Sequence, residues 1–171
     1  CMEQHPRDMA VYRARLLAAK VLEAKGDMKQ AEAYLQENLN EQLLTPASKE
    51  WRESLFALGE LLYTQRRYAD AIARLEEAVA RYPAAHQTLE ARYLIAAAMR
   101  QRAIELRSTL DQEPSEAVRK EHAEQARSLF EKSLAQFRAI QQTLGDRDSQ
   151  EMTALDKVIL RNARFAIGDL H

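Results

Sequence analysis

The sequence predicts an all-α protein made of short antiparallel helix pairs. Only four glycines and four prolines occur in 171 residues, which leaves little room for the turns of a β-rich fold. Apolar residues recur at i, i+3, i+4 and i+7 along most of the chain, a spacing that places them on one face of a helix. Hydrophobic residues make up 46% of the chain, enough to fill a core between such faces. We therefore expect about seven helices in one domain.

The first helix pair is expected over residues 10–44. An alanine- and leucine-rich stretch from about Met9 to Lys25 forms its first helix, and Gly26-Asp27 turns the chain into a second helix that ends near Leu44. The preceding residues 1–8 are polar and interrupted by proline, which is typical of a frayed terminus or a linker.

The second pair is expected over residues 47–83. Thr45-Pro46 is interpreted as an N-cap followed by proline at the first helical position, where its missing N–H costs nothing. The helix that follows carries Gly59 within its apolar stripe. Glycine costs about 1 kcal/mol relative to alanine inside a helix, so we expect a second helix to cross closely there. That second helix is predicted from Tyr68 to Arg81, and Pro83 ends it.

The third pair, residues 84–144, is expected to be longer than the others. Its first helix begins near Ala84 and runs to Leu110, and Glu113-Pro114-Ser115 breaks it. The return helix keeps an apolar stripe until Gly145 ends it. At 1.5 Å per residue, this hairpin projects about two to three turns beyond its neighbours.

Residues 148–171 are expected to form the first helix of a further pair. Asp148 and Glu151 are interpreted as a capping box that starts this helix, and the chain stops at His171 without a second helix. Terminal units of a stacked repeat protein need a polar outer face. We therefore expect a fragment of a longer array, whose last apolar face is open to further residues, another molecule or a second copy in an oligomer.

A six-residue pattern supports an internal repeat. It reads small, variable, large apolar, variable, apolar and tiny, and it occurs at residues 14–19, 54–59, 91–96 and 163–168. We expect the tiny residues that close each copy to mark equivalent helix crossings. These residues are Ala19, Gly59, Ala96 and Gly168.

Residues 51–83 resemble the tetratricopeptide repeat (TPR), a helix pair of about 34 residues whose copies stack into a superhelix. The residues that carry the match are Gly59, Ala71, Ala78 and Pro83. Leu55 departs from the family's usual aromatic residue, and Arg66 departs from its usual glycine. The resemblance implies an α-α superhelix of antiparallel pairs, and the elongated third hairpin expected over residues 84–144 departs from its usual repeat length.

The same resemblance implies a concave groove, lined by the first helices, that holds a peptide or a partner helix. The residues that it places in the groove are Arg13, Leu16, Lys20, Glu53, Phe56, Glu60, Tyr63, Glu90, Tyr93, Ala97, Arg100, Asn162, Phe165 and Asp169. Phe56, Tyr93 and Phe165 occupy the same slot in successive copies. They are either a ladder of binding anchors or residues that pack between adjacent repeats.

Charge and hydropathy exclude two classes of partner. The formal net charge is -1, so no overall field favours nucleic acid, and Glu90 and Glu105 interrupt the arginines of residues 92–107. No apolar run approaches the roughly 20 residues that a membrane span requires. We expect neither a nucleic-acid partner nor a membrane span.

Residues suited to catalysis or to metal and cofactor binding are scattered. The four histidines include no pair at helical metal-ligand spacing, the chain has one cysteine, and there is no glycine-rich phosphate loop. We therefore expect no enzyme activity, no metal and no cofactor.

Three functional hypotheses follow. The first is a non-enzymatic scaffold for protein–protein interaction. The second is a bacterial envelope lipoprotein that acts in outer-membrane or cell-wall assembly, with Cys1 as its lipid anchor; Tyr82-Pro83 followed by residues 91–93 resembles repeats of such proteins. The alternative to lipidation is that the sequence begins at Cys1 because the chain was trimmed there, without a lipid on the cysteine. The third is a docking or regulatory region of a larger enzyme. For the location of the protein, the sequence leaves two alternatives, the bacterial periplasm or envelope and the cytoplasm.

Overall fold

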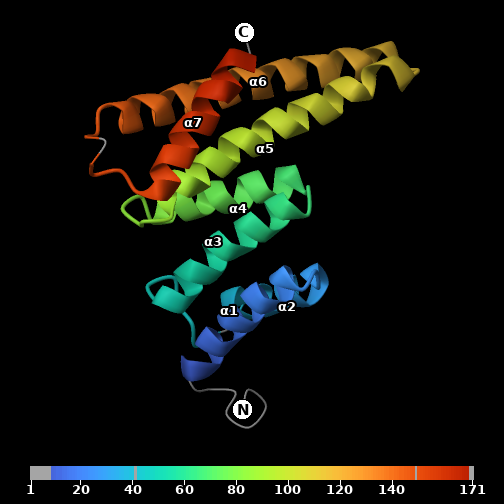
Figure 1. The fold of residues 1–171 in the computed structure, drawn as a ribbon. Coiled ribbons are helices and arrows are strands. Elements are labelled where there is room, and N and C mark those ends of the chain that lie inside the picture. Colours follow the sequence, from blue (N-terminus) through green and yellow to red (C-terminus); the bar gives the residue numbers. More distant parts are fainter. Residues whose placement is uncertain (1–8, 41, 149, 170–171) are drawn as a thin grey trace. The chain divides into compact units, whose positions relative to one another are not determined.

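A computed structural model describes residues 9–40, 42–148 and 150–169, and this part of the chain is all-helical without strands (Figure 1). The all-α prediction is confirmed. The elements are α1 (Met9–Ala24), α2 (Met28–Asn40), α3 (Lys49–Thr64), α4 (Tyr68–Arg81), α5 (Thr88–Ser108), the 3₁₀ helix η1 (Leu110–Gln112), α6 (Glu116–Gly145) and α7 (Ala154–Asp169).

The chain divides into two compact units, residues 1–85 and 86–171. In the first unit, α1 packs on α2, α2 on α3 and α3 on α4, and α1 also contacts α3. In the second unit, α5 packs on α6 and α6 on α7, and α5 also contacts α7. Each helix therefore packs against its neighbour in sequence, and first helices also contact each other within a unit.

The core of the first unit is held together by one buried amide as well as by leucines. Asn38 of α2 is fully buried, and its Nδ2 donates hydrogen bonds to the Tyr12 carbonyl of α1 (2.9 Å) and to Ser54 Oγ of α3 (3.0 Å). Leu16, Leu35 and further buried apolar residues of α1 to α4 pack in one cluster. Because a buried amide must keep its partners, this contact fixes the register of three helices.

The helix crossing expected at Gly59 is confirmed. A Cβ atom at this position would lie 2.5 Å from Leu75 Cδ2 of α4, so α3 and α4 approach too closely for any side chain. The crossing at Ala96 is also close, because Ser133 Oγ of α6 donates to the Ala96 carbonyl at 2.8 Å. Gly168 differs: nothing among the described atoms lies within 4 Å of its Cβ position. The expectation of an equivalent crossing at Gly168 is wrong for the described residues.

Two of the expected helix boundaries in residues 40–50 are wrong. α2 ends at Asn40 instead of near Leu44, and α3 begins at Lys49 with Ser48 as N-cap instead of at Thr45-Pro46. Local hydrogen bonds explain the later start, because Ser48 N–H donates to the Thr45 carbonyl at 2.9 Å and closes a turn.

Two later boundaries also shift. α5 begins at Thr88 instead of near Ala84, because Ala85 N–H closes a turn on the Tyr82 carbonyl at 3.0 Å. α7 is capped by Thr153 and Asp156, whose side chains each accept the other residue's backbone N–H at 3.1 and 3.0 Å. The capping box expected at Asp148 and Glu151 therefore lies one turn too early.

The turn between α3 and α4 contains an arginine in a conformation that favours glycine. Arg66 has φ of 60°, and Gly26, in the equivalent turn between α1 and α2, has φ of 86°. The left-handed region is strained for residues with a Cβ atom. Arg66 nevertheless adopts it, so this turn keeps the backbone conformation typical of glycine although its residue is arginine.

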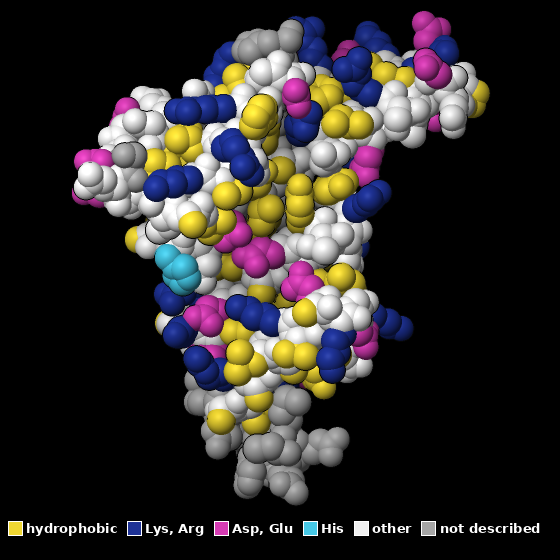
Figure 2. Space-filling view, in the orientation of Figure 1, with side chains coloured by type: hydrophobic (Ala, Val, Ile, Leu, Met, Phe, Trp, Pro, Cys, Tyr) yellow, Lys and Arg dark blue, Asp and Glu magenta, His cyan; other side chains and the backbone are white. Residues whose placement is uncertain are grey.

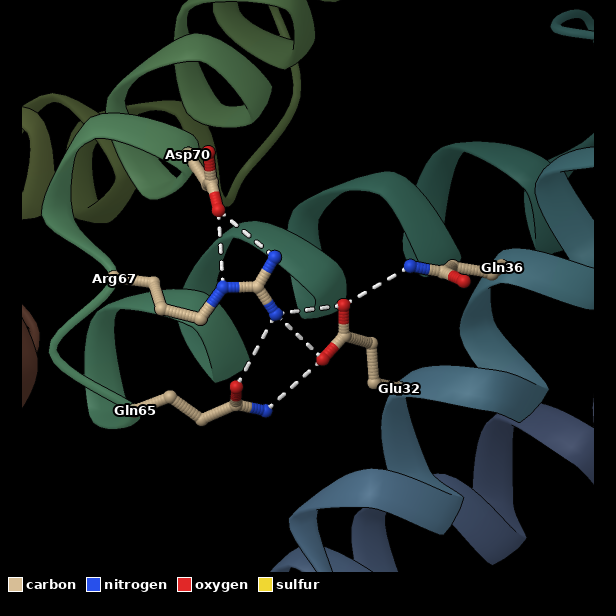
Figure 3. A network of polar contacts seen from close by, with 5 residues as sticks. All are labelled: Glu32, Gln36, Gln65, Arg67 and Asp70. Atoms are coloured by element: carbon tan, nitrogen blue, oxygen red, sulfur yellow. Dashed lines mark hydrogen bonds and ion pairs between the residues drawn. The ribbon is translucent and has the colours of Figure 1, made fainter.

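A polar network ties this turn to α2 (Figure 3). Arg67 Nη1 donates to both carboxylate oxygens of Glu32 at 2.8 Å, and Arg67 Nε donates to Asp70 Oδ2 at 2.9 Å. Gln65 Nε2 adds a bond to Glu32 at 3.3 Å. The hydrogen bond to Glu32, with that to Asp70, raises the pKa of the Arg67 guanidinium. The network joins the two helix pairs of the first unit.

Candidate functional site

The predicted groove residues of the first unit lie on α1 and α3. Arg13 and Lys20 of α1 are exposed, whereas Glu53, Glu60 and Tyr63 of α3 are half-buried. Because α1 contacts α3, these residues belong to neighbouring helices of one unit. The Tyr63 ring packs edge-on against Tyr68 of α4, with centroids 5.7 Å apart.

Phe56, which was predicted in the same groove, is buried in the core. Its side chain is 1% exposed, and its ring centroid lies 6.3 Å from that of Tyr82, which also contacts Trp51 at 6.4 Å. Burial raises the pKa of the Tyr82 phenol, and its hydroxyl donates to the Pro46 carbonyl. Of the two interpretations of the aromatic slot, packing describes Phe56.

In the second unit, the predicted groove residues of α5 and α7 contact each other directly. Asn162 Nδ2 donates to Tyr93 Oη at 3.4 Å, and Arg100 Nη2 forms an ion pair with Asp169 Oδ2 at 3.0 Å. Both contacts join residues separated by 69 positions, so α5 and α7 run in the same direction with one register. These four residues form a polar surface along two parallel helices.

The remaining groove residues of this unit are accessible to different degrees. Tyr93 is half-buried because its ring packs against Phe137 of α6, with centroids 5.9 Å apart. Glu90, in the first turn of α5, is also half-buried. Phe165 is 68% exposed. The three aromatic residues of the predicted ladder therefore lie in three environments: buried, half-buried and exposed.

A hollow of about 390 Å³ lies where the paired contacts of α5 and α7 end. Its apolar wall consists of Ile104, Phe130 and Leu134. Arg100 and Asp169 border it, and the Arg107 guanidinium lies over the Phe130 ring, 5.7 Å from its centroid. An apolar wall with charged groups at its rim suits an anchor side chain of a bound peptide.

The described residues contain no group of three histidine, cysteine, aspartate or glutamate side chains that could hold a metal ion. Within the described ranges, no helix combines the length and apolar character needed to cross a bilayer. Cys1, the position of the hypothetical lipid anchor, lies outside the described residues.

One surface was not singled out from the sequence. Lys157, Arg161 and Arg164 are exposed on α7, and together with Met152, Leu160 and Phe165 they line a second hollow of about 460 Å³. The cations recur at i, i+4 and i+7, so their shared helix face was readable from spacing alone.

No protein-family model matches the chain, and no curated protein sequence is significantly similar to it. The class that the described residues define is therefore structural: an all-helical protein whose helices pack in sequence order within two units.

Proposed function

We propose that this chain is a non-enzymatic scaffold that binds a partner protein or peptide along the surfaces of its first helices. In this proposal, the antiparallel pairs stack as in a TPR-like superhelix. The observation that carries it is the shared register of α5 and α7, whose Tyr93–Asn162 and Arg100–Asp169 contacts align two parallel first helices.

The α5/α7 surface carries polar side chains that can bind the backbone of a peptide along its length. Polar groups of Tyr93, Asn162 and Asp169 line it, and backbone amides of an extended peptide require such partners. The hollow beyond Arg100 and Ile104 supplies an apolar pocket at one end. Binding would therefore combine a polar track with one buried anchor.

The α1/α3 surface of the first unit is a separate second surface in this proposal. Arg13 and Lys20 present positive charge on α1, whereas Glu53 and Glu60 present negative charge on α3. Glu53 pairs with Lys49 at 3.6 Å. Phe56 is excluded from this region because it is buried.

A selection from a phage library of extended peptides, with the full chain immobilised, tests the proposal. We expect enriched peptides to share one large apolar residue, because the hollow takes one anchor. Ile104→Glu would place a charge in the apolar wall, and Asn162→Arg would block the polar track. Each variant should lower the affinity for the selected peptides by about tenfold or more, as measured by fluorescence anisotropy.

Matched controls separate local from general effects. Leu43→Glu introduces the same charge at another exposed apolar residue, and Lys120→Glu changes charge on the distal part of α6. Both should leave peptide affinity unchanged. Failure to enrich any peptide, or equal losses in control and groove variants with unchanged circular dichroism, would refute the proposal.

A further inference from the structure

The outer face of α7 combines a hollow with three cations. Lys157, Arg161 and Arg164 lie on one face of the helix, and Leu160 lies between them. With Met152 and Phe165 they line the hollow of about 460 Å³. Figure 2 shows basic side chains interleaved with apolar ones over the region of α7.

These cations have no counterions among the described residues. The two carboxylates of α7 are engaged elsewhere, because Asp156 pairs with Arg147 at 3.8 Å and Asp169 pairs with Arg100 at 3.0 Å. No ion pair or hydrogen bond of the Lys157, Arg161 or Arg164 side chains is found in the described ranges. The face therefore carries three positive charges that a ligand can neutralise.

The six-residue pattern relates this face to the face of α3 that receives α4. Arg164 and Gly168 occupy in α7 the places that Leu55 and Gly59 occupy in α3. Leu55 is 1% exposed, and Gly59 contacts Leu75 of α4. In α7 the same places are open, and a helix can approach Gly168 without a clash. A helix that approached Gly168 would lie near Arg164, at the place that the buried Leu55 occupies in α3.

We propose that the outer face of α7 docks an acidic amphipathic helix of another protein. Carboxylates of that helix would lie against Lys157, Arg161 and Arg164, and one large apolar side chain would enter the hollow beside Leu160. The inference goes beyond the groove proposed above, because it concerns the cations of α7 and not Asn162 and Asp169, the two residues whose side chains contact α5.

Charge complementarity favours this occupant over a second copy of the chain. In a two-fold symmetric contact each copy presents the same patch, so the three cations would face their own equivalents. Like charges at such spacing repel each other. An acidic helix supplies the opposite sign at the same helical spacing.

A phage library of helical peptides, randomised on one face and its flanks, tests this inference on the full chain. We expect enriched helices to carry aspartate or glutamate beside one large apolar residue. The double variant Arg161→Glu/Arg164→Glu should lower the affinity for these helices by about tenfold or more. Added salt should lower the affinity of the wild-type chain for them.

The double variant Arg119→Glu/Lys120→Glu is the matched control, because it makes the same charge change on exposed residues of α6 near the hairpin tip. It should leave affinity unchanged. Equal loss in both double variants, enriched helices without carboxylates, or no enriched helix would overturn the inference.

Two further measurements address other occupants. Sedimentation of the chain alone would reveal a dimer, and co-sedimentation with phosphatidylglycerol vesicles would reveal lipid binding. Either one, if abolished by Arg161→Glu/Arg164→Glu and retained by the control, would assign the face to that occupant and overturn the acidic-helix proposal. Loss of helix binding in Asn162→Arg alone would instead assign the selected helices to the groove.

Discussion

α3 and α7 carry the same six-residue pattern, yet one is covered and the other is open. In α3, Phe56 and Gly59 are buried beneath Tyr82 and Leu75. In α7, Phe165 is 68% exposed and Gly168 has open space around it. The difference shows that the pattern specifies a helix able to receive a neighbour, whereas burial depends on whether a neighbour is there.

The largest expected effect comes from the aromatic slot. Phe56→Ala should lower the free energy of unfolding by about 3–5 kcal/mol, because it empties a fully packed site. Phe165→Ala should change it by less than about 0.5 kcal/mol, because that ring is mostly in solvent. Urea denaturation followed by circular dichroism measures both. Equal losses would show that the two slots are packed alike, contrary to the structure.

The glycines give a smaller effect with opposite expected signs. Gly59→Ala should destabilise by about 1–2 kcal/mol, since overpacking against Leu75 outweighs the helix propensity gained. Gly168→Ala should be neutral or stabilise by up to about 0.5 kcal/mol, because it only adds propensity near a helix end. Thermal unfolding of both variants compares them. A destabilised Gly168→Ala would mean that a helix crosses there after all.

The smallest effect concerns the contact that aligns α5 with α7. A double-mutant cycle with Arg100→Met and Asp169→Asn should give a coupling energy of about 0.3–1 kcal/mol, because the pair is partly exposed. The coupling should fall as salt is added. Zero coupling in low salt would remove one of the two contacts that define the shared register.

Helices with strong local end signals were predictable from the sequence. The bounds of α4 follow from its apolar stripe and Pro83, and the end of α6 follows from Gly145. The end of α2 did not, because Leu44 continues the apolar pattern although its backbone lies beyond the helix. Leu44 is 3% exposed, so it is buried although it lies in the loop after α2, and periodicity alone does not separate this case from a helix.

The candidate site was predictable in part. The resemblance to tetratricopeptide repeats placed Tyr93, Arg100, Asn162 and Asp169 in one groove, and the structure joins them in two side-chain contacts. The resemblance did not decide whether Phe56 binds a partner or packs in the core, because Tyr82, which packs against its ring, comes from a distant segment. The six-residue pattern predicted a helix crossing at Gly168. The spacing of the cations on the same helix face was not used to predict a site.

The buried amide of Asn38 has a consequence for the order in which the chain folds. One of its partners, Ser54, is synthesised after α1 and α2 are complete. Until α3 is synthesised, the amide hydrogen of Asn38 that later bonds to Ser54 needs a water molecule as its acceptor. The first hairpin by itself therefore cannot exclude water from the surroundings of Asn38. Vectorial synthesis would thus hold the first pair loosely docked until the third helix emerges.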